Sequence, residues 1–170
     1  MSIEAPQSSD ALVFFGATGD LAFKQIFPAL LALVDRHGLN IPIVGVAKAG
    51  WNLEQFRQRA LDSIKAHGSF DEATFQRFAQ LLRYVDGDYR DPQTFADLRT
   101  ALDGAKRPLH YLAIPPSFFA TVVEGLVKSG CAVTARVVVE SDRRAPLDLE
   151  MEIEQERRYG DTSIRIHWHQ

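Results

Sequence analysis

The sequence predicts an α/β protein built on a doubly wound parallel sheet, and three observations support this prediction. Over residues 11–140, short apolar runs alternate with segments whose apolar residues recur at helical spacing. The short runs are apolar throughout, as expected of parallel strands that are buried on both faces. A turn that contains glycines joins the first run to the first helical segment. We therefore expect one domain over residues 11–140 and a divergent tail over residues 141–170.

The positions of the elements follow from apolar spacing and from residues that begin or end helices. Strands are expected at residues 11–15, 41–46, 83–85, 109–114 and 136–139. Helices are expected at about residues 20–36, 53–67, 71–82, 92–102 and 118–128. Their expected caps are Asn52, Asp91 and Ser117 at amino ends, and Gly38 and Gly130 after carboxyl ends.

The tail has a different pattern from the rest of the chain. Apolar and charged residues alternate strictly over residues 147–154 and again over 163–169, with Gly160 and Asp161 between the two runs. A period of two predicts strands, so the tail could form an antiparallel hairpin that pairs an acidic face with a basic one. A charged helix over residues 147–158 is the alternative. In the hairpin, His167 and His169 are expected on a solvated face.

The composition is that of one globular domain. The 170 residues are 46% hydrophobic and 24% charged, with a net charge of −3, which gives no reason to expect a nucleic-acid partner. Cys131 is the only cysteine, so neither an internal disulfide nor a four-cysteine zinc site can form, and we expect no metal. No apolar run approaches the roughly 20 residues of a membrane span, and no signal peptide is evident. We expect a cytoplasmic protein without a membrane partner.

The turn after the first strand has the layout of a site for dinucleotide phosphates. Gly16 allows a tight turn, and Gly19 allows the backbone to approach a ligand without an intervening Cβ. The free N–H groups at the start of the helix then face an anion. The alternative is a strand–turn–helix unit that binds nothing.

The end of the second strand suggests which dinucleotide would bind. An acidic residue there suits the ribose of NAD, and a basic one suits the 2′-phosphate of NADP. Here the strand ends at Lys48, and Thr18 could add a hydroxyl bond to the same phosphate. Lys48 could also be an ordinary surface lysine. We expect NADP, with NAD as the other candidate.

Four segments, in the same order, resemble the amino-terminal part of the glucose-6-phosphate dehydrogenase family. They are Gly16-Ala17-Thr18-Gly19-Asp20-Leu21-Ala22, Val44-Gly45-Val46-Ala47-Lys48, Tyr111-Leu112-Ala113-Ile114-Pro115-Pro116-Ser117-Phe118 and Arg136-Val137-Val138-Val139-Glu140. The resemblance implies a Rossmann-type NADP-binding domain over residues 11–140. It also implies the family reaction, in which glucose 6-phosphate and NADP give 6-phosphogluconolactone and NADPH in the pentose phosphate pathway. The cofactor-binding residues it implies are Gly16, Ala17, Thr18, Gly19, Asp20, Leu21, Lys48, Ile114, Pro115, Pro116 and Glu140.

The departures from the family pattern concern the substrate and the catalytic base. Many members have a lysine near the substrate at the position of Gln25, and Lys24 is the nearest cation here. The family continues Lys-Pro-Phe-Gly after Glu140, and this chain does not. The Arg-Ile-Asp-His motif with its base histidine is not found, and we expect His37, His67 and His110 to lie away from the site. We therefore assign no catalytic residue and expect a chain that is truncated or altered after Glu140, lacks the substrate domain and is inactive alone.

Three classes of function stay open at this point. The chain could be an enzyme or the cofactor-binding part of one. It could instead be a catalytically inactive NADP-binding module. It could also be a regulatory or interaction fragment whose tail adds a strand to a partner. Glucose 6-phosphate would bind only with a second domain, the chain could form a homo-oligomer, and its tail could be a frameshifted end or a selected one.

Overall fold

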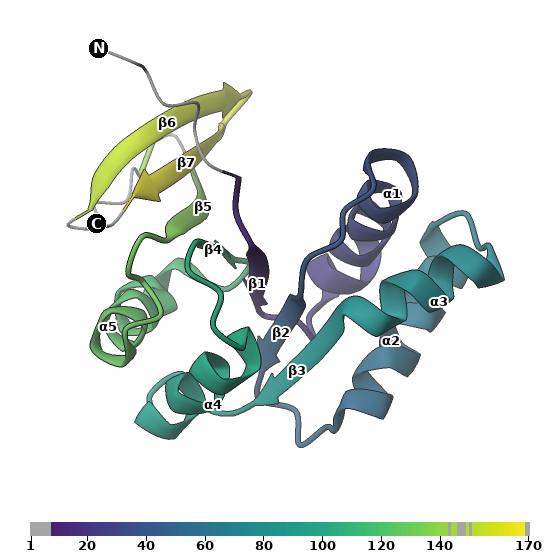
Figure 1. The fold of residues 1–170 in the computed structure, drawn as a ribbon. Coiled ribbons are helices and arrows are strands. Elements are labelled where there is room, and N and C mark those ends of the chain that lie inside the picture. Colours follow the sequence, from purple (N-terminus) through teal and green to yellow (C-terminus); the bar gives the residue numbers. More distant parts are fainter. Residues whose placement is uncertain (1–7, 143, 146–148, 150, 169–170) are drawn as a thin grey trace, which may run out of the picture.

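A computed structural model of the chain describes residues 8–142, 144–145, 149 and 151–168. Its centre is a seven-stranded sheet with the strand order β3-β2-β1-β4-β5-β7-β6 (Figure 1). The parallel strands are β1 (Ala11–Phe15), β2 (Ile43–Ala47), β3 (Leu82–Asp86), β4 (Pro108–Leu112) and β5 (Arg136–Asp142). Their arrangement confirms the predicted doubly wound sheet. β1 lies between β2 and β4, so the first strand is central among the parallel strands.

Helices cover both faces of the parallel part of the sheet (Figure 1). One face is packed against α1 (Phe27–His37), α2 (Leu53–His67) and α3 (Glu72–Leu81), and the other against α4 (Pro92–Leu102) and α5 (Phe119–Ser129). Successive side chains of a strand point to opposite faces. Phe14 therefore packs in the core beneath α1, α2 and α3, and Phe15 packs in the core beneath α4 and α5. Both side chains are fully buried. This double burial explains why the strand is apolar throughout.

The helix ends confirm most of the predicted caps. The Asn52 side chain forms a capping box with Gln55, and Asp91 accepts a hydrogen bond from a first-turn N–H. Gly38 and Gly130 end their helices in the left-handed conformation. The cap predicted at Ser117 is wrong. A short 3-10 turn, η2 (Pro116–Phe118), precedes α5, and Phe118 stands at the cap position without a side-chain bond.

The first helix is not regular at its start. Its residues Ala22–Ile26 form a π-helical turn, η1, where the apolar spacing predicts a continuous helix. Pro28 provides the physical reason, because proline has no N–H and its ring clashes with the carbonyl four residues earlier in a regular α-helix. In the wider turn the backbone N–H of Phe27 donates to the carbonyl of Ala22, five residues earlier. The carbonyl of Phe23 accepts a hydrogen bond from the hydroxyl of Ser63 on α2.

The tail forms the hairpin, and the alternative of a charged helix is wrong. Its strands are β6 (Glu152–Tyr159) and β7 (Thr162–Trp168). β7 also pairs antiparallel with β5, so the hairpin extends the sheet. This pairing runs to Asp142, which explains why β5 is longer than predicted. Residues 147, 148, 150 and 169 of the predicted alternating runs lie outside the described residues.

One side of the hairpin is covered where the sequence predicts a solvated face. His167 is only 1% exposed, and its Nδ1 lies 3.3 Å from the carbonyl oxygen of Met151. Ser163, on the same side of β7, is also buried. Alternation shows which residues share a face, but it does not show which face the rest of the chain covers. An acidic and a basic residue do pair across the hairpin, Arg165 with Glu156 at 2.9 Å, although Glu156 lies beyond the predicted acidic run.

Candidate functional site

The glycine turn after β1 is held firmly on one side and open on the other. Gly16 has φ +82°, and a Cβ there would lie 2.2 Å from the carbonyl oxygen of Ala113. Its N–H donates to the hydroxyl of Tyr89 at 2.9 Å and to the carbonyl of Val46 at 3.0 Å. Gly19 is exposed, and a Cβ there would meet only the carbonyl oxygen of Gly16 within 4 Å. Because Gly16 has no side chain, the turn can pack against the backbone of Ala113 directly after β4. Gly19 leaves the start of the helix accessible.

A cleft of about 370 Å³ opens at the carboxyl ends of β1, β4 and β5. It brings together many of the residues predicted from the sequence, from three separate segments of the chain. Its lining consists of Gly16, Gly19, Asp20, Leu21, Tyr111, Leu112, Ala113, Ile114, Pro115 and Glu140. Burial, together with the charge of the Glu140 carboxylate, raises the pKa of Tyr111 to about 12. The Tyr111 phenol therefore stays protonated at neutral pH.

The other predicted cofactor residues lie outside the lining of this cleft. Ala17 is fully buried, and its methyl group fills the space over Gly45 of β2. Thr18 is half-buried, and Pro116 is exposed. Lys48 is exposed directly after β2, where the sequence places it.

Lys24, the candidate for the substrate, lies on the π-helical turn. Its ammonium is 3.7 Å from the carboxylate of Asp20, which lines the cleft. Both side chains are more than half exposed, so this ion pair contributes little to stability. Lys24 is therefore a cation near the cleft that is free to change partner.

The end of β3 and the loop that follows it supply site residues that the sequence analysis did not identify. The carboxylate of Asp86 accepts hydrogen bonds from the backbone N–H groups of Ala49, Gly50 and Trp51, at 2.8–3.3 Å. The hydroxyl of Tyr84 donates to the same oxygen at 2.8 Å. Partial burial opposes ionisation of Asp86, but these hydrogen bonds outweigh it and hold the pKa of Asp86 below its ordinary value. Asp86 thus fixes the loop that carries the end of the second strand into α2.

Asp88 and Tyr89 extend this arrangement toward the ends of β1 and β2. Asp88 accepts a hydrogen bond from the ammonium of Lys48 at 2.9 Å. The N–H of Arg90 and this ammonium lower the pKa of Asp88. No sequence signal separates these residues from those of an ordinary loop, because acidic and aromatic residues after a strand are common in turns.

The cleft has the features that an anionic dinucleotide needs. The first N–H groups of a helix have no acceptor within the helix, and the helix dipole favours negative charge there. Gly19 and Asp20, at this helix start, are exposed. Among the residues that line the cleft there is no lysine or arginine. A pyrophosphate at this place would therefore depend mainly on backbone N–H groups.

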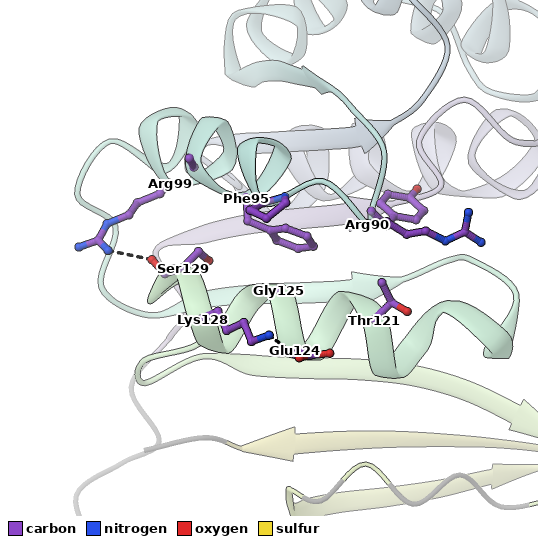
Figure 2. A pocket seen from close by; sticks show the side chains of 11 residues that line it. Arg90, Phe95, Arg99, Thr121, Glu124, Gly125, Lys128 and Ser129 are labelled. Carbon is purple, nitrogen blue, oxygen red and sulfur yellow. Dashed lines mark hydrogen bonds and ion pairs between the residues drawn. The ribbon is translucent and has the colours of Figure 1, made fainter.

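A larger cavity, of about 430 Å³, lies between α4 and α5 (Figure 2). Two of its three cationic side chains have polar partners, and the guanidinium of the third, Arg90, lies 5.6 Å from the centre of the Phe118 ring. Arg99 donates to the carbonyl of Ser129 at 2.8 Å, and Lys128 forms an ion pair with Glu124. This cavity is built from helix faces rather than strand ends, so we regard the smaller cleft as the candidate site.

The histidines of the described residues do not line the cleft. His110 lies in the middle of β4 and is fully buried, with Nε2 2.9 Å from the carbonyl oxygen of Cys131, and burial lowers its pKa to about 4. His37 ends α1 and is exposed. His67 ends α2, and its ring centre lies 5.4 Å from that of Phe23 on the π-helical turn. Within the described ranges, no group of three or more histidine, cysteine or acidic residues is arranged to hold a metal ion.

The sheet order, the glycine turn and the cleft where strand order reverses define a Rossmann-type dinucleotide-binding domain. The comparison with known families agrees, because the profile described as "Glucose-6-phosphate dehydrogenase, NAD binding domain" matches residues 13–152. The chain belongs to this family, whose cofactor is NADP.

Individual relatives point to the same family. Glucose-6-phosphate 1-dehydrogenase 1 of Mycobacterium tuberculosis is 42% identical over 133 residues, which are 78% of this chain and 28% of the relative. The crystal structure of glucose-6-phosphate 1-dehydrogenase from Mycobacterium avium superposes with a TM-score of 0.72 and 46% identity, over 76% of this chain and 29% of that one. A structure of glucose-6-phosphate dehydrogenase in complex with glucose-6-phosphate gives a TM-score of 0.67 and 26% identity, over 78% of this chain and 30% of that one.

The chain spans under a third of the length of these relatives. The part compared is the amino-terminal domain, and the β6–β7 hairpin lies mostly beyond the residues that the family profile matches. In the part of the chain that the structure describes, no helix has the length and apolar character to cross a membrane.

Proposed function

We propose that this chain is the NADP-binding part of a glucose-6-phosphate 1-dehydrogenase. In the whole enzyme, C1 of glucose 6-phosphate would be oxidised to the lactone as NADP is reduced, the entry reaction of the pentose phosphate pathway. The observation that carries the proposal is the cleft at the carboxyl ends of β1, β4 and β5, which joins the glycine turn to Ile114, Pro115 and Glu140.

Each part of the site would have a different role toward the dinucleotide. The backbone N–H groups of Asp20 and Leu21 would hold the pyrophosphate at the helix start, since the N–H of Gly19 already donates to the carbonyl of Gly16 at 3.0 Å. Lys48, with Thr18, would bind the 2′-phosphate of the adenosine ribose. Pro115 and Glu140, which line the cleft, would border the nicotinamide. Bound NADP supplies the hydride acceptor.

The sugar phosphate needs groups beyond those of this cleft. Hydride transfer from C1 requires a base within hydrogen-bond reach of the C1 hydroxyl, and no histidine lines the cleft in the described residues. Lys24 is the one cation near the cleft that we assign to the substrate. We propose that the chain binds the dinucleotide alone, and that glucose 6-phosphate binds only when the remainder of the enzyme is supplied.

Two further features belong to this proposal. We propose a cytoplasmic location, supported by the buried thiol of Cys131, which forms no disulfide. We also propose that the chain associates with itself, supported by the edge strand β6, which is exposed along its whole length. Size-exclusion chromatography with light scattering tests self-association, and a monomer at all concentrations would contradict it.

Calorimetry with the full chain tests the proposed cofactor site. We expect NADP to bind to the folded chain with weak but measurable affinity. Gly19→Leu should abolish that binding while the protein stays folded, because its side chain would enter the open space over the helix start. Ala73→Leu, on the exposed side of α3, adds a similar side chain elsewhere and should bind NADP normally. The absence of binding at millimolar NADP would defeat the proposal.

A further inference from the structure

Asp88 and Lys48 form an ion pair where the second and third strands end. The Lys48 ammonium and the Asp88 carboxylate oxygen are 2.9 Å apart. The backbone brings the two residues together, because the N–H of Gly87 donates to the carbonyl of Ala47 at 2.9 Å. The pairing therefore follows from contact between the ends of β2 and β3, and not from a chance approach of two long side chains.

Asp88 is the more firmly placed member of the pair. Its second carboxylate oxygen accepts from the N–H of Arg90 at 2.9 Å, and its carbonyl accepts from the hydroxyl of Thr94 at 2.7 Å. Its side chain is 35% exposed, against 71% for Lys48. Gly87 keeps the chain close to α4, because a Cβ there would lie 2.2 Å from the Thr94 hydroxyl oxygen. The carboxylate is thus held in place, and the flexible ammonium is drawn toward it.

The two charges favour different dinucleotides at the same position. An ammonium attracts the 2′-phosphate of NADP and donates hydrogen bonds to it, whereas a carboxylate repels that phosphate. A carboxylate can accept a hydrogen bond from the 2′-hydroxyl of NAD, the role that an acidic residue after the second strand has in other sites of this type. Here the carboxylate comes from the loop after the third strand.

We propose that Asp88 is a specificity-determining residue that offsets the charge of Lys48 and lets the site accept NAD as well as NADP. The proposal rests on the proposed function, because it requires the adenosine ribose to lie beside Lys48. It makes Asp88, and not Lys48 alone, responsible for the choice of dinucleotide.

Calorimetric titration of the full chain with NADP and, separately, with NAD tests this proposal. Wild type should bind both. Asp88→Asn keeps an oxygen for the N–H of Arg90 and removes the charge, so NADP should bind roughly three- to tenfold more tightly while NAD does not gain. The gain should shrink at high salt. Asp97→Asn, an identical change on the exposed side of α4, should leave the preference unaltered.

The outcomes separate this inference from the function on which it rests. A folded wild-type chain that binds neither dinucleotide overturns the proposed function. Wild-type binding of NADP without NAD, or an unchanged preference in Asp88→Asn, overturns the role of Asp88 alone. An equal gain in NADP affinity in Asp97→Asn also overturns the role of Asp88, since the gain would then reflect only the net charge of the protein. If circular dichroism shows that Asp88→Asn is unfolded, Asp88→Ser, which also accepts a hydrogen bond and is neutral, decides between the same outcomes.

Discussion

The backbone N–H of Gly16 donates a hydrogen bond to the phenol oxygen of Tyr89, 2.9 Å away. The same hydroxyl points its own hydrogen at the carbonyl of Val46, at 3.3 Å. Burial raises the pKa of Tyr89, so the phenol keeps that hydrogen at neutral pH. One side chain from the loop after β3 therefore joins the glycine turn to the end of the second strand.

Replacing Tyr89 with phenylalanine should weaken NADP binding without unfolding the protein. The change removes one of the two acceptors of the Gly16 N–H, leaving the carbonyl of Val46, and so loosens the turn. A hydrogen bond of this kind contributes about 0.5–1.5 kcal/mol, so the dissociation constant measured by calorimetry should rise roughly two- to tenfold. Tyr159→Phe, on the exposed strand β6, is the matched control and should bind like wild type. Equal affinities in the two variants would show that Tyr89 does not position the turn.

Gly16→Ala should destabilise the fold strongly. Alanine is strained at φ +82°, and its Cβ would lie 2.2 Å from the Ala113 carbonyl oxygen, which is backbone and cannot rotate away. Gly38→Ala is the control, since Gly38 has φ +64° but nothing within 4 Å of a Cβ. Urea denaturation should show a loss of about 1 kcal/mol for Gly38→Ala and at least about 3 kcal/mol for Gly16→Ala. Similar losses of stability in the two variants would mean that backbone strain at positive φ, and not the contact with the Ala113 carbonyl oxygen, excludes a side chain at Gly16.

The loop held by Asp86 should open at acidic pH. The folded pKa of Asp86 lies below its ordinary value of 3.8, so its stabilising contribution is complete above that value. The contribution is lost as the pH falls through the folded pKa. Trp51 lies in this loop, and Trp168→Phe leaves it as the only tryptophan, so its fluorescence should report the opening.

Asp86→Asn separates this effect from that of other carboxylates. At neutral pH the variant should be less stable than wild type by about 1 kcal/mol, because the hydrogen bonds lose a charged acceptor at an exposed position. Below the folded pKa the two proteins should become equally stable. A difference that persists at acidic pH would show that the charge of Asp86 is not what holds the loop.

The chain alone should form no NADPH from glucose 6-phosphate and NADP. Binding that places the sugar against the nicotinamide can supply about 7–11 kcal/mol of the barrier reduction, and the cleft holds neither a base histidine nor a cluster of cations. The measurement is NADPH absorbance with purified protein at saturating substrate. Turnover that disappears in Gly19→Leu would contradict the prediction, because a contaminating enzyme would not respond to that change.

His67 provides an internal check on this expectation. It lies beside Phe23 of the π-helical turn and is exposed, so its ring is accessible to solvent. If any turnover is found, His67→Ala should leave it unchanged. Loss of turnover in that variant would assign a role to His67, although it does not line the cleft.

The sheet and the glycine turn could be predicted from the sequence because they depend on local patterns. A run such as Val13-Phe14-Phe15 must be buried on both faces, and Gly16 must turn where a side chain would clash with Ala113. Caps such as Asn52 act within one turn of their helix. These features need no knowledge of distant segments.

The features that could not be predicted depend on contacts between distant segments. Tyr89 reaches Gly16 across 73 positions of the chain, and Asp88 reaches Lys48 across 40. The covered side of β7 at His167 depends on where the segment around Met151 lies. The π-helical turn was missed for another reason. Its cause, Pro28, is close in the sequence, but a prediction from apolar spacing alone does not take proline into account.

The position of the β6–β7 hairpin determines which part of the molecule opens first. β6 pairs only with β7, and β7 joins the rest of the sheet only through β5, so the hairpin can detach without breaking any pair between parallel strands. Its two strands follow the five parallel strands in the sequence. Local unfolding should therefore begin there, and amide hydrogens of β6 should exchange with solvent far faster than those of β1. The cleft, built from β1, β4 and β5, can keep its shape while the end of the chain opens and closes.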